Sequence, residues 1–299
     1  MGRPASPLVA VAGIEPLEIR SARPSGPHRF SAALMLPREH GAWAMLLMPY
    51  AVGVAAAGWG GWASVLLLLS VLFLFISSRP LEVAAQRGSD LPEILARRRQ
   101  GMLRVALYLI GASASGLTLL FYFGLWYLVP IGAAASAFLA IQLLLRRRRL
   151  DRTWPARLVS IGALSATGPA AYYTATGVLN LHAAAIWLLV SLYSGASIFY
   201  VRLYYRLGGR DKRPETVARA RAEIALILYL VVAVVLAAAL SLLRWLPPLA
   251  AVGFAPLIAK SLWALRRRDE RPSLKQLGLA EIGHTTLFAL LAAVLVRTW

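Results

Sequence analysis

Long apolar runs alternate with short polar segments along most of the chain. Several of these runs reach the roughly 20 residues that a helix needs to cross a hydrocarbon core of about 30 Å. The pattern therefore predicts an all-α fold, a polytopic bundle of transmembrane helices. Nine spans are expected, near residues 41–58, 62–78, 103–122, 126–145, 158–177, 181–200, 222–243, 246–264 and 279–296.

The composition agrees with this class of protein. Apolar residues make up 59% of the chain and the mean hydropathy is +0.64, whereas about 45–50% apolar residues is usual in soluble domains. Residues 1–35 are instead rich in Pro, Ser, Gly and Arg, and we expect a flexible cytoplasmic tail before a single membrane domain, residues 36–299. The lack of cysteine excludes disulfides, thiolate catalysis and cysteine-ligated metals.

The formal charge of +19 lies almost entirely on one side of the predicted membrane. Short turns alternate with long connections, which lie at 79–102, 146–157, 201–221 and 265–278. The tail and these connections with their flanks hold 30 of the 32 Lys and Arg residues, counting Lys260 with the last connection. By the positive-inside rule the N-terminus is cytoplasmic and, after nine spans, the C-terminus is outside. A bacterial-type cytoplasmic (inner) membrane is the expected location.

This distribution accounts for the charge without nucleic acid, for which the sequence has no motif. Arginine runs beside the spans, such as 97–99 and 146–149, are interpreted as topology anchors. Such residues attract anionic lipid by about 1 kcal/mol each, so membrane lipids are expected partners.

Two local features bear on how the helices are shaped and packed. Gly168-Pro169 is expected to kink the fifth span, as a packing feature of small residues rather than a binding site. After the second span, Asp90 and Glu93 resemble a capping pair, which predicts a short helix ending near Arg99 at Gly101.

Ionisable residues near the ends of the first and last spans are the candidates for catalysis. Glu281 and His284 are three residues apart, hence neighbours on one helix face, and an ionisable pair at that depth indicates function. Glu39 and His40 enter the first span from the same cytoplasmic side, and would meet them if the two spans adjoin. These four residues could act as proton carriers, as metal ligands, or as a polar latch between the terminal helices.

Other charged residues at the cytoplasmic ends of the spans are candidates for substrate binding. Arginine forks and tyrosine hydroxyls suit a phosphate or pyrophosphate group, whereas the alternatives are a surface ion pair and arginines snorkelling in an aromatic interface. The candidates are Arg38, Arg79, Glu82, Arg202, Tyr204 and Arg206.

The segments "LPREHGAWAMLLMP" (residues 36–49) and "SSRPLE" (residues 77–82) carry a family resemblance. They resemble the YwiC-like membrane proteins, whose signature is a Pro-Arg-Glu-His-Gly-Ala-Trp segment at the start of the first span. The resemblance implies an integral membrane protein and specifies no reaction.

The arrangement of spans is also similar to the UbiA-type prenyltransferases. That resemblance implies aspartate-rich motifs after the second and sixth spans, which hold Mg²⁺ and an isoprenoid pyrophosphate. In this chain the connection after the second span has Glu82 in place of the aspartate-rich motif. In the connection after the sixth span the first acidic residue is Asp211, so Mg²⁺ is only weakly supported as a cofactor. Arginine would then supply the counter-charge for a phosphate.

Two functions follow as hypotheses from different classes. The first is binding of a lipid or isoprenoid, phosphorylated or not, in a cytoplasm-facing cavity, with divergent UbiA-like prenyl-group transfer as the reaction to test. The alternative is a proton-coupled transporter or a lipid-handling membrane protein without catalysis, in which the Glu and His residues relay protons.

Overall fold

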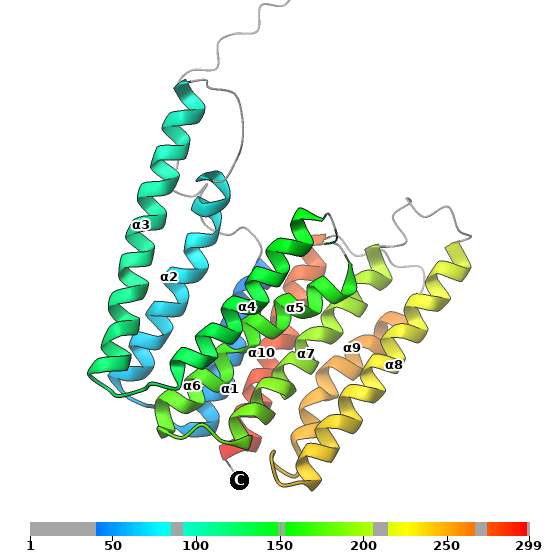
Figure 1. The fold of residues 1–299 in the computed structure, drawn as a ribbon. Coiled ribbons are helices and arrows are strands. Elements are labelled where there is room, and N and C mark those ends of the chain that lie inside the picture. The colour runs from blue at the N-terminus through cyan, green and yellow to red at the C-terminus, as the bar shows by residue number, and fades with distance from the viewer. Residues whose placement is uncertain are drawn as a thin grey trace, which may run out of the picture. The chain divides into compact units, whose positions relative to one another are not determined.

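The computed structural model describes residues 40–84, 92–148, 150, 153–205, 215–266 and 274–297, and its regular structure there is helical (Figure 1). The chain divides into two units, residues 1–34 and 35–299, and every described residue belongs to the second. The elements are α1 (His40–Ala57), α2 (Trp62–Ala84), α3 (Pro92–Phe121), α4 (Leu128–Arg147), α5 (Trp154–Ser165), α6 (Thr167–Thr176), α7 (Leu181–Tyr205), α8 (Glu215–Leu242), the short 3-10 helix η3 (Ala250–Phe254), α9 (Ala255–Arg266) and α10 (Leu274–Arg297).

Each predicted span falls on a helix or on two consecutive helical segments. Span 158–177 corresponds to α5 and α6 together, and span 246–264 corresponds to η3 and α9. Among the described residues, four segments are long and apolar enough to cross a membrane, namely Arg98–Phe121, Leu181–Val201, Arg219–Leu242 and Gly278–Leu295. The prediction of an all-helical membrane protein is thus confirmed at this level.

The helix predicted to end at Gly101 does not end there. α3 runs without a break from Pro92 to Phe121, so that prediction was wrong. A glycine inside a helix costs only about 1 kcal/mol, and proline is well suited to the first helical position, where its missing N–H is no loss. The arginines of α3 and its apolar span therefore belong to one continuous helix.

The kink predicted at Gly168-Pro169 is confirmed as a break between α5 and α6. α5 ends at Ser165 and α6 begins at Thr167. Pro169 has no N–H for the carbonyl of Ser165, four residues earlier, so the helical ladder is interrupted there. The break, at Ala166, lies two residues before Gly168 and three before Pro169.

The start of α6 packs against α1 through residues without bulky side chains. A Cβ added to Gly168 would lie 3.2 Å from the carbonyl oxygen of Pro49, and one added to Gly53 would overlap the Gly168 carbonyl. Thr167 donates a hydrogen bond of 3.1 Å to the carbonyl of Leu46, across the same contact. Close backbone approach of this kind stabilises helix pairs in lipid, which confirms the packing interpretation.

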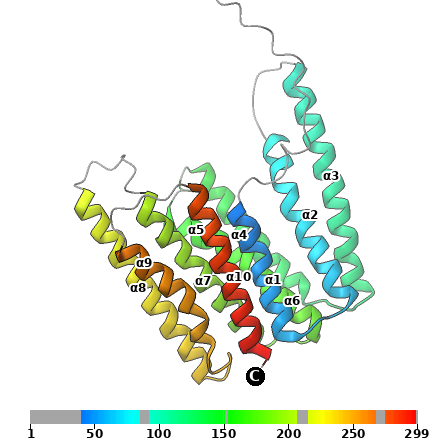
Figure 2. The same cartoon turned by 180° about the vertical axis from the view of Figure 1, so that it is seen from behind.

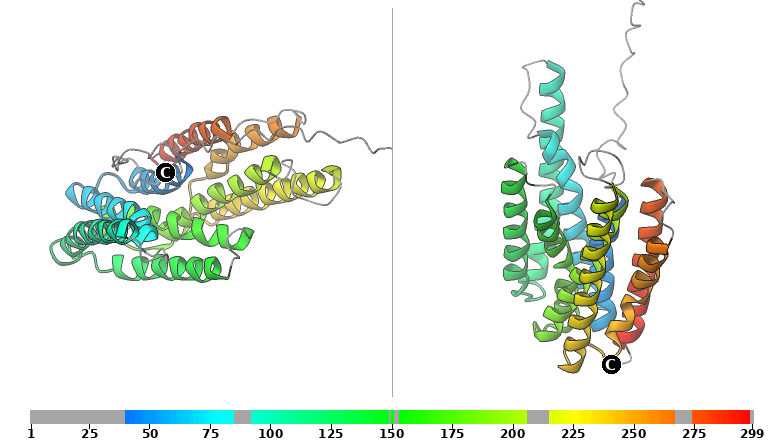
Figure 3. Two further views of the ribbon diagram at one scale, coloured as in Figure 1. Left: turned by 90° about the horizontal axis from the view of Figure 1, so that it is seen from above. Right: turned by 90° about the vertical axis from the view of Figure 1, so that its right-hand side faces the viewer.

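α1 also packs along α10, and α10 contacts α9, so the three helices follow one another (Figures 2 and 3). α7 and α8 pack together beside them, and their apolar core includes Tyr193, Leu226, Phe254, Leu257 and Phe288. α2 and α3 pack against each other as a pair, and α2 also contacts α6 (Figure 1). The junction of α7, α9 and α10 is where the buried charges lie.

Candidate functional site

A buried ammonium group lies at the junction of α7, α9 and α10. Lys260 is in the second turn of α9, and its side chain is only 2% exposed. Lys260 was counted with the basic residues flanking the last cytoplasmic connection, but its side chain lies inside the bundle and not in the connection. Proximity to the end of an apolar run does not distinguish a lysine in the head-group region from one that points into the bundle.

The counter-charge of Lys260 is Glu281, on the second turn of α10. One carboxylate oxygen of Glu281 accepts a hydrogen bond from the Lys260 Nζ and forms an ion pair with it. The other oxygen accepts a hydrogen bond from the Ser197 hydroxyl on α7. Both oxygens of one carboxylate are therefore held from two other helices.

The second side of the Lys260 ammonium group faces an aromatic ring. Its Nζ lies 3.8 Å from the ring centroid of Tyr200, which is 3% exposed. A cation over a tyrosine face is attracted by the ring quadrupole, the more so when both groups are desolvated. Ser197 and Tyr200 are three residues apart on α7, so one face of that helix supplies both contacts.

Tyr193 closes the site on the side of the apolar core. Its ring stacks on Phe288 at a centroid distance of 3.8 Å, and its hydroxyl donates a hydrogen bond of 2.8 Å to the carbonyl of His284. Tyr193 is four residues before Ser197 on the same face of α7. The ion pair thus has an aromatic layer beneath it, which excludes water from that direction.

The structure gives the two members of the predicted Glu281–His284 pair different partners. Glu281 is engaged by Lys260 and Ser197. His284 Nδ1 lies 2.6 Å from the carbonyl oxygen of Ala280, one turn earlier in its own helix. We assign the hydrogen to Nδ1 on this contact, which makes Nε2 the basic nitrogen.

The neighbouring hydroxyl of Ser261 adds a polar group to this part of α9. Ser261 follows Lys260 and is 1% exposed, and its Oγ has no hydrogen-bond partner within the described ranges. A buried hydroxyl without a partner costs free energy, so its presence directly after Lys260 in the chain needs an explanation.

The other predicted site residues remain predictions. α1 and α10 do adjoin, which is the condition set for a shared site between the terminal helices (Figure 2). His40 is the first residue of α1, whereas Arg38 and Glu39 lie outside the described residues. The same limit applies to Arg206 and to the side chains of His40, Arg79, Glu82, Arg202 and Tyr204.

Three further observations bound the site. His182 lies 3.1 Å through Nδ1 from the Trp245 carbonyl in the turn after α8. Within the described ranges, no group of three His, Asp or Glu residues could share a metal ion. Sequence reasoning missed Lys260 and Ser197, although a lysine inside the apolar run 246–264 was a usable signal for the first of them.

Comparison with known proteins supports a family assignment for the N-terminal half. The family model described as YwiC-like protein matches residues 36–172, from the segment before α1 into α6. The Bacillus subtilis (strain 168) protein named "Uncharacterized protein YwiC" is 25% identical over 172 residues, 58% of this chain and 67% of that protein. No solved structure matches the chain. Over residues 36–172 the chain is therefore similar to the YwiC-like family, as its "LPREHGAWAM" segment indicates.

Proposed function

We propose that this protein is a proton-coupled membrane transporter in which Glu281 carries the proton. The observation that carries the proposal is the Lys260–Glu281 ion pair, buried at the junction of three helices. Ionisable residues inside a membrane bundle are costly, and they mark ion pathways and proton relays.

A purely structural role explains this pair poorly. Taking both charges out of water costs several kcal/mol per ion, and well-packed apolar residues of similar size often stabilise a protein as much or more. The surrounding core is already built from apolar and aromatic side chains. A charge pair at this place therefore serves a purpose that an apolar pair could not serve.

The balance of charge indicates what the proton is coupled to. In the paired state the ammonium and the carboxylate cancel. A proton on Glu281 would leave Lys260 without a counter-charge, at a cost of several kcal/mol in an apolar interior. A monovalent anion taken up with the proton restores neutrality, so we propose a small carboxylate or phosphate monoanion as the transported species. Ser261, whose buried hydroxyl has no described partner, is a ready donor to such an anion.

The proposed orientation follows the distribution of arginine. The N-terminus is cytoplasmic, the C-terminus is outside, and the membrane is the inner membrane of a bacterial-type cell. Glu281 is seven residues past the start of α10, about 10 Å along the helix. This depth would place the proton site near the cytoplasmic side of a bundle with a UbiA-like arrangement of nine spans.

Proton uptake that depends on an added anion tests the proposal with a small panel of anions. Proteoliposomes loaded with a pH-sensitive dye should show a transient internal acidification when phosphate or a small carboxylate is added outside, because proton and anion enter together. We expect Glu281→Gln to abolish the transient. The combined variant Lys260→Met with Glu281→Gln should also lack it, although it leaves no uncompensated buried charge and should fold.

The control is Glu223→Gln on α8, which removes a carboxylate of similar exposure, 15% against 14%. Glu223 pairs with Arg219 one turn away on the same helix, so its loss should leave the transient intact. A wild-type transient in both Glu281 variants would refute the proposal.

The second candidate is binding of a lipid or isoprenoid, with prenyl-group transfer as its possible chemistry. The packing of α1 against α10 favours it, because these two helices were expected to meet at a shared cavity. The predicted lining of that cavity remains Arg38, Glu39, His40, Arg79, Glu82, Arg202, Tyr204, Arg206 and His284. A fluorescent prenyl diphosphate should bind the purified protein and bind the double variant Arg202→Ala with Arg206→Ala more weakly. Absence of binding to the wild type would exclude this function.

A further inference from the structure

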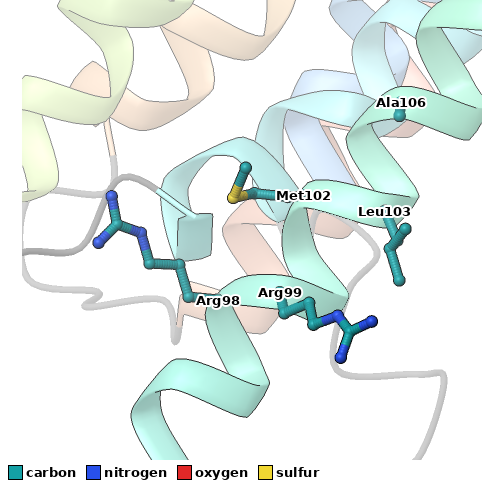
Figure 4. Close-up of a pocket in the computed structure, with 5 residues that line it drawn as sticks. All are labelled: Arg98, Arg99, Met102, Leu103 and Ala106. Atoms are coloured by element: carbon teal, nitrogen blue, oxygen red, sulfur yellow. The ribbon is translucent and has the colours of Figure 1, made fainter. Parts of the chain in front are cut away.

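An open groove on α3 combines two arginines with an apolar surface (Figure 4). Its volume is about 410 Å³, and Arg98, Arg99, Met102, Leu103 and Ala106 line it. These residues recur at spacings of three and four, so they form one side of the helix. Because α3 is continuous through Gly101, the arginines and the apolar residues keep a fixed register.

The groove lies where the apolar span of α3 begins. The candidate span starts at Arg98, and beyond it Leu103, Leu107 and Ile110 are each more than 60% exposed. In the described part of the chain, α3 packs chiefly on α2. Its remaining surface therefore offers cationic groups at one end and a continuous apolar stripe beyond them.

The two arginines point in different directions. Consecutive residues on a helix are separated by about 100°, and Figure 4 shows the guanidinium groups of Arg98 and Arg99 extending to opposite sides. Within the described ranges, neither forms an ion pair with an acidic side chain. Two guanidinium groups that extend in different directions are more suited to binding two phosphates than one.

We propose that this groove binds an anionic phospholipid with two phosphate groups, of the diphosphatidylglycerol type. Each guanidinium contacts one phosphate through paired N–H donors, as its planar fork allows. The acyl chains lie along Met102 and Leu103 and continue over Leu107, while the short side chain of Ala106 leaves the floor of the groove open. Charge complementarity and the position at the start of a span select lipid over a protein partner.

Lipid binding by the full-length protein in detergent, followed by native mass spectrometry, tests this proposal. At equal phosphate concentration, the two-phosphate lipid should bind at least tenfold more tightly than phosphatidylglycerol. Arg98→Ala with Arg99→Ala should weaken that binding about thirtyfold, since each arginine contributes about a factor of five to association with anionic lipid.

The matched control is Arg157→Ala with Arg266→Ala, which removes the same charge from exposed positions on α5 and α9. This variant should retain wild-type binding. An equal loss in both double variants would show general surface attraction and overturn the proposal. So would equal affinity for the one- and two-phosphate lipids.

Two other occupants are separated by further arms of the same experiment. Inorganic pyrophosphate carries the two phosphates without the chains, and it should not displace the lipid at comparable concentration. Displacement by pyrophosphate would show a site for a soluble anion. Dimers that form without lipid and are lost on Leu103→Gln would show that a second copy of the chain covers the groove, which would also overturn the proposal.

Discussion

At the scale of residues, Glu281 is the group on which the candidate site depends. It joins α10 to α9 through Lys260 and to α7 through Ser197. Apart from the contacts of Glu281, the described polar contacts of the site can be removed without leaving a charge unpaired. Changing one member of the ion pair should therefore cost more stability than changing both, and this difference separates a structural from a functional role.

Lys260→Met alone should destabilise the protein by about 3–5 kcal/mol, because it leaves the buried Glu281 carboxylate without its counter-charge. Adding Glu281→Gln to it removes that charge and keeps an oxygen for the Ser197 hydroxyl. We expect the double variant to recover most of the lost stability, measured by thermal unfolding in detergent. Additive losses in the two single variants and the double variant would show that the two residues do not act as a pair.

At the scale of elements, the contact between α1 and α6 fixes where α6 begins. Gly53 and Gly168 meet backbone to backbone, and the break after α5 gives α6 its own direction. The kink could be predicted because proline acts through the chain geometry next to it. Its partner could not be predicted, because small residues occur in most spans and their spacing does not say which helices meet.

Gly53→Ala should destabilise the protein by about 1–3 kcal/mol, because the added methyl group would overlap the Gly168 carbonyl and force the helices apart. The matched control is Gly132→Ala in α4, where an added Cβ meets nothing within 4 Å. There alanine should stabilise the helix by about 0.5–1 kcal/mol. Unfolding temperatures of the two variants provide the comparison, and equal shifts would contradict the close approach.

At the scale of the whole molecule, hydropathy was sufficient to locate the helices and insufficient to locate the site. The bilayer requires each span to be long and apolar, so the spans can be predicted from the local sequence. The pairing of Lys260 with Glu281 and Ser197 depends on which of the helices are neighbours. Glu281 was found because an acid in a span is conspicuous, whereas Lys260 was assigned to a cytoplasmic connection that is crowded with other basic residues.

The orientation of the whole bundle is open to a direct test, because the chain has no cysteine. Single cysteines can be placed at Val178, in the turn between α6 and α7, and at Arg148, after α4; both positions are exposed. A membrane-impermeant maleimide applied to intact cells should label Val178→Cys at once and Arg148→Cys only after the membrane is opened. Leu243 and Arg244, in the turn after α8, should behave as Val178 does, since an even number of spans separates the two turns. Labelling of Arg148→Cys in intact cells would reverse the orientation, and the proton site at Glu281 would then face the outside.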